Sequence, residues 1–75
     1  MAKKATVQSF EVILELEEEG GYHIFTPALK GCHSCGATRE EALMNIAEAI
    51  TLWLESAKEL GIPIPERDRV TVKVK

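Results

Sequence analysis

The chain has 75 residues and a mass of 8.3 kDa, which allows one small domain and excludes a two-domain enzyme. Hydrophobic residues make up 45% and charged residues 28% of the sequence, a composition typical of a folded protein and unlike a disordered tail. The net charge of −3, with no basic cluster longer than Lys3-Lys4, argues against direct nucleic-acid binding and favours a basic protein partner. We therefore predict a single domain, 1–75, that acts through protein contacts.

The N-terminal sequence gives no signal for export. Small and polar residues follow Lys3 and Lys4, where a signal peptide needs an apolar stretch of about 7–15 residues. No apolar run approaches the roughly 20 residues of a membrane-spanning helix. We expect a cytoplasmic protein that does not contact a membrane.

Three strands are expected in the first half of the chain. Apolar and polar residues alternate between Thr6 and Leu16, a period of two that predicts a strand with one buried face. The glycines of Glu17–Gly21 suit a tight turn, so the next apolar run, Tyr22–Thr26, is predicted to return antiparallel. A short third strand is predicted over Cys32–Cys35. The residues expected on the buried face of the first strand are Phe10, Val12, Leu14 and Leu16.

One long helix is expected next. Thr38 and Glu41 form a capping-box pattern, in which the Thr38 hydroxyl accepts from the Glu41 amide and the Glu41 carboxylate reaches back to Thr38. Gly61 is suited to a left-handed residue after the helix, so we predict a helix of about 22 residues starting near Arg39. The apolar stripe predicted to be buried contains Leu43, Ile46, Ala47, Ile50, Trp53, Leu54, Ala57 and Leu60.

The element order predicts an α+β fold in two layers. Alternating valines over Val70–Val74 predict a fourth strand, which gives the order β-β-β-α-β with one long helix on one face of the sheet. A single helix covers only one face. We expect the other face, with candidates Val7, Ile13 and Phe25, to be apolar and to form a dimer or partner surface.

Two cysteines and two histidines raise the question of a metal or redox site. Cys32 and Cys35 lie three residues apart in a predicted strand, so they point to opposite faces with Cα atoms roughly 10 Å apart, beyond disulfide reach. A structural zinc site normally needs four ligands, and the chain has a single C-x-x-C pair. We predict no metal, no cofactor, one core cysteine and one partly exposed thiol. An orphan metal- or ligand-binding domain using Cys32, Cys35, His23 and His33 is the alternative.

The acidic residues do not form a catalytic set. Three strands followed by a helix invite comparison with ribonuclease-H-like nucleases, which hold two metal ions with carboxylates. Glu11 or Glu15 and Glu48 are candidates, but the predicted fourth strand supplies no carboxylate. No serine or carboxylate is placed to complete a set with His23 and His33. We predict no catalytic residues and no enzyme activity.

Several short motifs together resemble the HicB antitoxin family. The match runs from about Phe10 to Pro65 and rests on Glu18–Tyr22, Pro27–Ser34, Gly36–Leu43 and Asn45–Ile50. The resemblance implies a partial ribonuclease-H-like fold with sheet order 3-2-1-4 and without nuclease activity. It also implies a non-catalytic antitoxin that masks a small basic mRNA-cleaving toxin of the HicA type and forms a homodimer or larger homo-oligomer.

The resemblance implies that many members of the family carry an added DNA-binding domain. The sequence shows no such domain after the predicted fourth strand, so we expect no direct DNA binding. A third possibility is a HicB-like fold retained without a toxin.

Surface masking requires acidic groups that replace RNA phosphates on a basic toxin. The candidate partner-binding residues are Glu17, Glu18, Glu19, Phe25 and His33.

Overall fold

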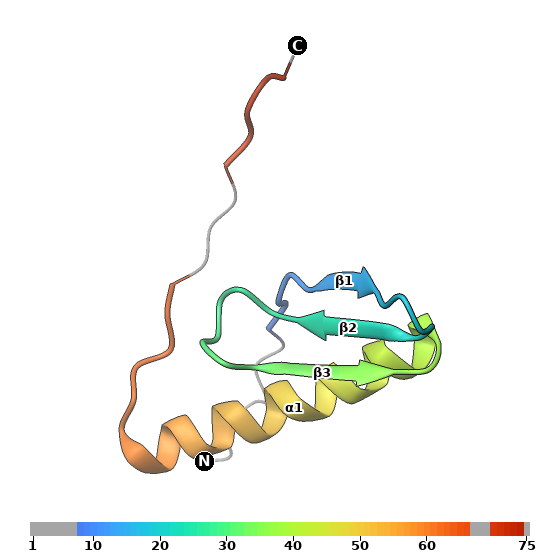
Figure 1. The fold of residues 1–75 in the computed structure, drawn as a ribbon. Helices are drawn as coiled ribbons and strands as arrows, with labels where there is room; N and C mark the ends of the chain where they lie inside the picture. The colour runs from blue at the N-terminus through green and yellow to red at the C-terminus, as the bar shows by residue number, and fades with distance from the viewer. Residues whose placement is uncertain (1–7, 67–69, 75) are drawn as a thin grey trace.

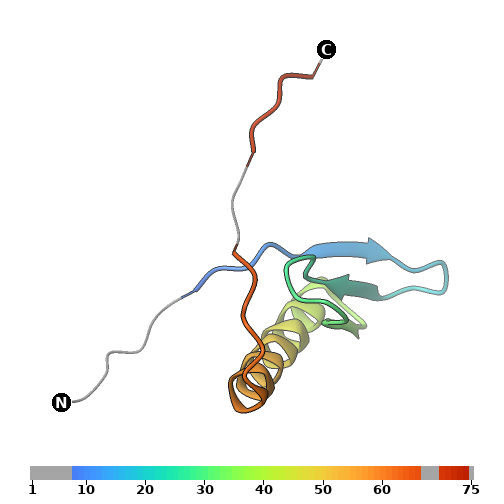
Figure 2. The ribbon, with the colours of Figure 1, turned by 90° about the vertical axis from the view of Figure 1, so that its left-hand side faces the viewer.

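A computed structural model describes residues 8–66 and 70–74 of the chain. Three strands form an antiparallel sheet in the order β1-β2-β3, and one helix follows them (Figure 1). The elements are β1 (Ile13–Leu16), β2 (Tyr22–Phe25), β3 (His33–Gly36) and α1 (Arg39–Leu60). Figure 2 shows α1 against one face of the sheet, and no other described segment covers the opposite face. The predicted two-layer α+β fold is therefore confirmed.

Glycines close the hairpin between β1 and β2. Gly20 and Gly21 have φ values of 96° and 82°, in the left-handed region that glycine enters without strain. The Gly20 amide donates to the Glu17 carbonyl, and the Glu17 amide donates to the Gly21 carbonyl, both at 3.0 Å. The predicted turn over residues 17–21 is confirmed.

Thr26 marks the place where the ladder between β1 and β2 ends. Its amide donates to the Cys32 carbonyl at 3.2 Å, and its buried hydroxyl donates to the Glu11 carbonyl at 2.8 Å. Pro27 follows and has no amide to donate. At this position the Thr26 side chain, and not a backbone amide, donates to the Glu11 carbonyl. The backbone hydrogen bonds between the two strands stop here, so β1 begins only at Ile13, and residues 8–12 of the predicted first strand lie outside the sheet.

The helix starts as predicted, with one difference in its cap. The Glu41 amide donates to the Thr38 hydroxyl at 3.1 Å. The Glu41 carboxylate accepts from the Ala37 amide at 2.9 Å, whereas the sequence pattern predicts the Thr38 amide as its donor. The carboxylate therefore satisfies a donor one residue earlier and fixes the bend between β3 and α1.

The helix also ends as predicted. Gly61 has a φ of 71°, its amide donates to the Lys58 carbonyl at 3.3 Å, and the Ile62 amide donates to the Ala57 carbonyl at 2.8 Å. These two bonds form a Schellman motif, which closes the last turn.

In the described part of the chain, no helix has the length and apolarity needed to cross a membrane.

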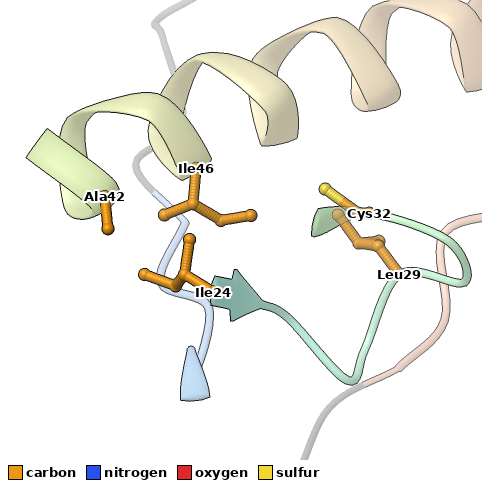
Figure 3. Packing of buried hydrophobic residues seen from close by; sticks show 5 residues of the cluster. All are labelled: Ile24, Leu29, Cys32, Ala42 and Ile46. Carbon is orange, nitrogen blue, oxygen red and sulfur yellow. The ribbon is translucent and has the colours of Figure 1, made fainter. Parts of the chain in front are cut away.

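The core lies between α1 and the inner face of the sheet. Ile24 of β2 and Ala42 of α1 are fully buried, and Figure 3 shows Ile24 directed toward Ala42 and Ile46 of the helix. Leu29 and Cys32 of the β2–β3 connection complete the cluster. Within the predicted stripe, Ala47 and Leu60 are exposed instead, because they lie at the side and the end of the helix.

Gly36 allows α1 to lie close to β3. A Cβ atom at this position would stand 2.8 Å from the Cα of Ala42 and 2.9 Å from the carbonyl carbon of Glu41. Both atoms belong to the backbone, which has little freedom to move aside. The Asn45 side chain holds the same contact by donating to the Cys35 carbonyl at 2.7 Å.

Two predictions about the sheet need correction. Residues 70–74 form no strand, so the structure contains the 3-2-1 part of the predicted order 3-2-1-4 and does not confirm the fourth position or the ribonuclease-H-like details. Leu16, predicted to be buried, is 72% exposed because α1 packs against β2 and β3 and leaves the end of β1 uncovered.

Candidate partner-binding face

The face of the sheet that points away from α1 is formed by alternate residues of all three strands. In the register, Ile13 pairs with Phe25 and Phe25 with His33, while Glu15 pairs with His23 and His23 with Cys35. Neighbouring residues of a strand point to opposite faces, and Ile24 points into the core, so these side chains point outward. We call this surface the outer face, and its residues are Ile13, Glu15, His23, Phe25, His33 and Cys35.

Three aromatic rings lie together at the centre of the outer face. The His23 and Phe25 rings stack with centroids 5.8 Å apart and planes inclined by 26°. The His33 ring lies 5.5 Å from the His23 ring with a tilt of 56°. Two of these rings can donate or accept hydrogen bonds while their faces remain apolar, which suits a contact with both polar and apolar groups.

A carboxylate borders these rings. Glu15 Oε1 lies 3.1 Å from His23 Nδ1, and the Glu15 side chain is 60% exposed. Such an exposed pair contributes little to folding, about 0–1 kcal/mol. Because most of its surface faces solvent, the Glu15 carboxylate is accessible to a cationic group of a partner.

The β2–β3 connection adds a hollow beside the rings. The hollow has a volume of about 620 Å³ and is lined by His23, Phe25, His33 and residues of the connection, including Leu29 and Lys30. Trp53 of α1 holds the connection in place, since its indole N–H donates to the Lys30 carbonyl at 3.0 Å. The outer face is therefore supported by the helix on the opposite side of the sheet.

The three consecutive acidic residues lie at the tip of the β1–β2 hairpin. Glu17, Glu18 and Glu19 are exposed, and they line a shallow depression together with Gly20. They follow β1 directly, beyond the paired residues Leu16 and Tyr22. Among the predicted partner-binding residues, the structure brings Phe25 and His33 together on the outer face and places the three glutamates at one end of the sheet.

The predicted cysteine and histidine cluster is divided by the sheet. Cys32 is buried in the core, while Cys35 is exposed on the outer face, as the three-residue spacing predicts. Burial raises the pKa of the Cys32 thiol, so this thiol keeps its proton and is a poor nucleophile or metal ligand. Within residues 8–66 and 70–74, no three histidine, cysteine or acidic side chains are placed to hold a metal ion.

The outer face is more polar than predicted. Ile13 is 39% exposed and lies on this face together with half-buried Phe25, as expected, whereas Val7 lies outside the described residues. Glu15 and His23 are not among the predicted partner-binding residues, although His23 belongs to the alternative cysteine and histidine cluster and Glu15 is one of the carboxylates considered for a nuclease. Counting strand positions outward from the turn at 17–21 pairs them, so the signal was present in the sequence.

The chain is similar to a known protein family over most of its length. Residues 10–75 match the family described as HicB_like antitoxin of bacterial toxin-antitoxin system. The chain belongs to the HicB-like antitoxin family. This confirms the resemblance found in the sequence, supports an antitoxin role and implies that the partner of this HicB-like chain is a toxin.

Relatives of this HicB-like chain occur in bacteria and archaea. A UPF0150 protein of Synechocystis (ssr1765) is 50% identical over 64 residues, which cover 85% of this chain and 81% of the relative. A UPF0150 protein of Thermoplasma acidophilum (Ta0767) is 40% identical over 65 residues, which cover 87% of this chain and 94% of the relative. No solved structure matches the chain.

Proposed function

We propose that this HicB-like chain neutralises a small basic mRNA-cleaving toxin of the HicA type by binding the toxin's RNA-contacting surface with the outer face. The protein acts in the cytoplasm and performs no chemistry of its own. Membership of the antitoxin family supports the role, and the composition of the outer face supports the place of contact.

The observation that carries this proposal is a ring cluster bordered by carboxylates on a face without a covering helix. His23, Phe25 and His33 provide a central contact area of the kind that dominates protein interfaces. Glu15 and the hairpin glutamates provide negative charge. In the complex, these carboxylates would take the place of the RNA phosphates that the toxin's basic surface otherwise binds. The strands carry no lysine or arginine on this face, and Lys30 lies at its border in the β2–β3 connection.

Titration calorimetry with a purified HicA-type toxin from the same genome tests the place of contact. We expect Phe25→Ala and His33→Ala each to weaken toxin binding about tenfold or more, corresponding to at least about 1.4 kcal/mol. Leu52→Ala is the matched control, because Leu52 is a large apolar residue, 57% exposed, on α1. Equal losses in all three variants would place the contact elsewhere.

Charge reversal tests the acidic part of the contact. The variant Glu17→Lys, Glu18→Lys, Glu19→Lys should slow association with the toxin at low salt, and the difference should shrink as salt screens the charges. The control reverses three exposed glutamates of α1, Glu48, Glu55 and Glu59, and so makes the same change in net charge on another element. If both triple variants associate at the same rate, the hairpin does not contact the toxin.

A cleavage assay tests the function itself. An equimolar amount of this chain should protect mRNA from the toxin, and protection should fall in Phe25→Ala in proportion to its loss of affinity. The chain alone should leave the RNA intact. RNA cleavage by the purified chain, or full protection by a variant that no longer binds, would overturn the proposal.

A further inference from the structure

The outer face carries hydrogen-bond acceptors at the end next to the β1–β2 hairpin. His23 Nδ1 lies 3.1 Å from Glu15 Oε1, and since a carboxylate only accepts hydrogen bonds, Nδ1 of His23 is the donor. A neutral imidazole that donates from Nδ1 has an acceptor at Nε2. The Glu15 side chain is 60% exposed and that of His23 is 34% exposed, so a partner can reach both. This end of the outer face therefore suits a group with several N–H donors.

Aromatic ring faces continue from these acceptors along β2. Phe25 lies two residues beyond His23 on the same strand, and the centroids of the two rings are 5.8 Å apart. The His33 ring on β3 lies 5.5 Å from the His23 ring. Ring faces carry partial negative charge and attract cations. A long side chain that lies along β2 would contact ring surface first and the acceptors at its end.

The hollow of about 620 Å³ beside the rings provides access for such a side chain. Its lining joins Glu15 and His23 to the β2–β3 connection, where Pro27 and Leu29 are apolar. Lys30 also belongs to the connection, which follows β2, whereas Glu15 pairs with the second residue of β2. The acidic group and the lysine therefore come from opposite ends of the hollow. Figure 2 shows that no described segment lies over this side of the sheet.

We propose that the outer face receives an arginine side chain of the toxin. The arginine stem crosses Phe25, and the guanidinium stacks on the His23 ring and donates to the Glu15 carboxylate. This inference rests on the proposed function and names the group that the outer face recognises. A guanidinium is planar, carries five N–H donors and is less strongly hydrated than an ammonium, so it can lie on a ring and bind a carboxylate at once. Its apolar stem suits the ring faces.

Other side chains fit this place less well. The lysine ammonium is a compact, strongly hydrated charge without a flat surface to stack on a ring. An acidic side chain would be repelled by Glu15. An apolar side chain would cover Glu15 and His23 without offering donors, which leaves buried polar groups unpaired. Arginine also binds phosphates in the bidentate manner, so its capture would remove a contact that the toxin needs for RNA.

Double-mutant cycles with the full chain and a purified HicA-type toxin from the same genome test the inference. Each surface arginine of the toxin is changed to lysine and titrated against the unmodified chain and against Glu15→Gln. At one toxin position, lysine should weaken binding about tenfold to the unmodified chain and at most about twofold to Glu15→Gln. The same position should couple to Phe25→Leu, which keeps an apolar side chain and removes the ring. Glu48→Gln, at an exposed glutamate of α1, is the matched control and should keep the tenfold loss.

The outcomes separate this inference from the proposed function. The inference is overturned if no toxin arginine couples to Glu15, if a toxin lysine changed to methionine couples to Glu15 instead, or if the coupling to Glu48→Gln is as large. It alone fails when Phe25→Ala still weakens toxin binding more than Leu52→Ala does. When those two variants lose the same affinity, the toxin does not bind the outer face, and the proposed place of contact fails together with the inference.

Discussion

The two faces of the sheet are built from alternate residues of the same three strands, but they differ in burial and in chemical character. On the inner face, Ile24 is fully buried against Ala42 and Ile46, and its role is packing. On the outer face, His23, Phe25 and His33 form a partly exposed ring cluster beside Glu15. The difference shows that the period of two of a four-residue strand separates side chains that pack in the core from side chains that stay available for the proposed toxin contact.

Because the two faces differ in burial, substitutions on the inner face should lower the free energy of unfolding, and substitutions on the outer face should weaken toxin binding. The largest effect is expected for Ile24→Ala, because a fully buried side chain is lost and a cavity remains. Such substitutions typically cost about 2–5 kcal/mol of unfolding free energy. Ile13→Ala is the control of the same chemistry on the outer face, where Ile13 is 39% exposed, and it should cost less than half as much in urea unfolding. Equal costs would contradict the division between the faces.

A smaller loss is expected at the buried hydrogen bond that joins the end of β2 to the segment before β1. The Thr26 hydroxyl is buried and donates to the Glu11 carbonyl at 2.8 Å. Thr26→Val keeps the shape but leaves that carbonyl without its donor, which should cost about 1–3 kcal/mol in the same unfolding experiment. Thr26→Ser keeps the hydroxyl and should recover part of that loss, so a serine variant no better than valine would assign the effect to packing.

The two cysteines extend the comparison to pH. Burial raises the pKa of the Cys32 thiol above its ordinary value of 9.0, whereas Cys35 is exposed. Between 9.0 and the raised value, the unfolded chain loses this proton and the folded chain keeps it, so stability should fall as pH rises. The slope is at most about 1.4 kcal/mol per pH unit. In urea unfolding at alkaline pH, Cys32→Ala should remove this fall and Cys35→Ala should retain it; the reverse result would contradict the assignment.

The sequence predicted best those features that depend on neighbouring residues. Helix α1 has its predicted cap at Thr38 and its predicted stop at Gly61, because both ends are set by contacts within a few residues. The hairpin turn at residues 17–21 follows for the same reason. The separation of Cys32 from Cys35 also follows from local geometry, as the strand period alone decides it.

Features that depend on distant residues were harder to predict. The exposure of Leu16 depends on where α1 crosses the sheet, and the bond from Thr26 to Glu11 joins residues far apart in the chain. The pattern of Val70–Val74 is that of a strand, but a pattern does not contain the position of its partner. At the site, strand alternation placed Phe25 on the outer face, whereas its contact with His23 and His33 required the register across β2 and β3.

The smallest expected effect concerns the ion pair on the outer face. Glu15 and His23 lie 3.1 Å apart, and both side chains are partly exposed, so water screens their attraction. A double-mutant cycle with Glu15→Gln and His23→Gln should give a coupling energy for folding below about 1 kcal/mol, measured by urea unfolding at neutral pH. The same cycle measured on toxin binding should give a larger coupling, because a partner that covers the pair removes the screening water. A larger coupling in folding than in binding would mean that the pair serves the sheet and not the contact.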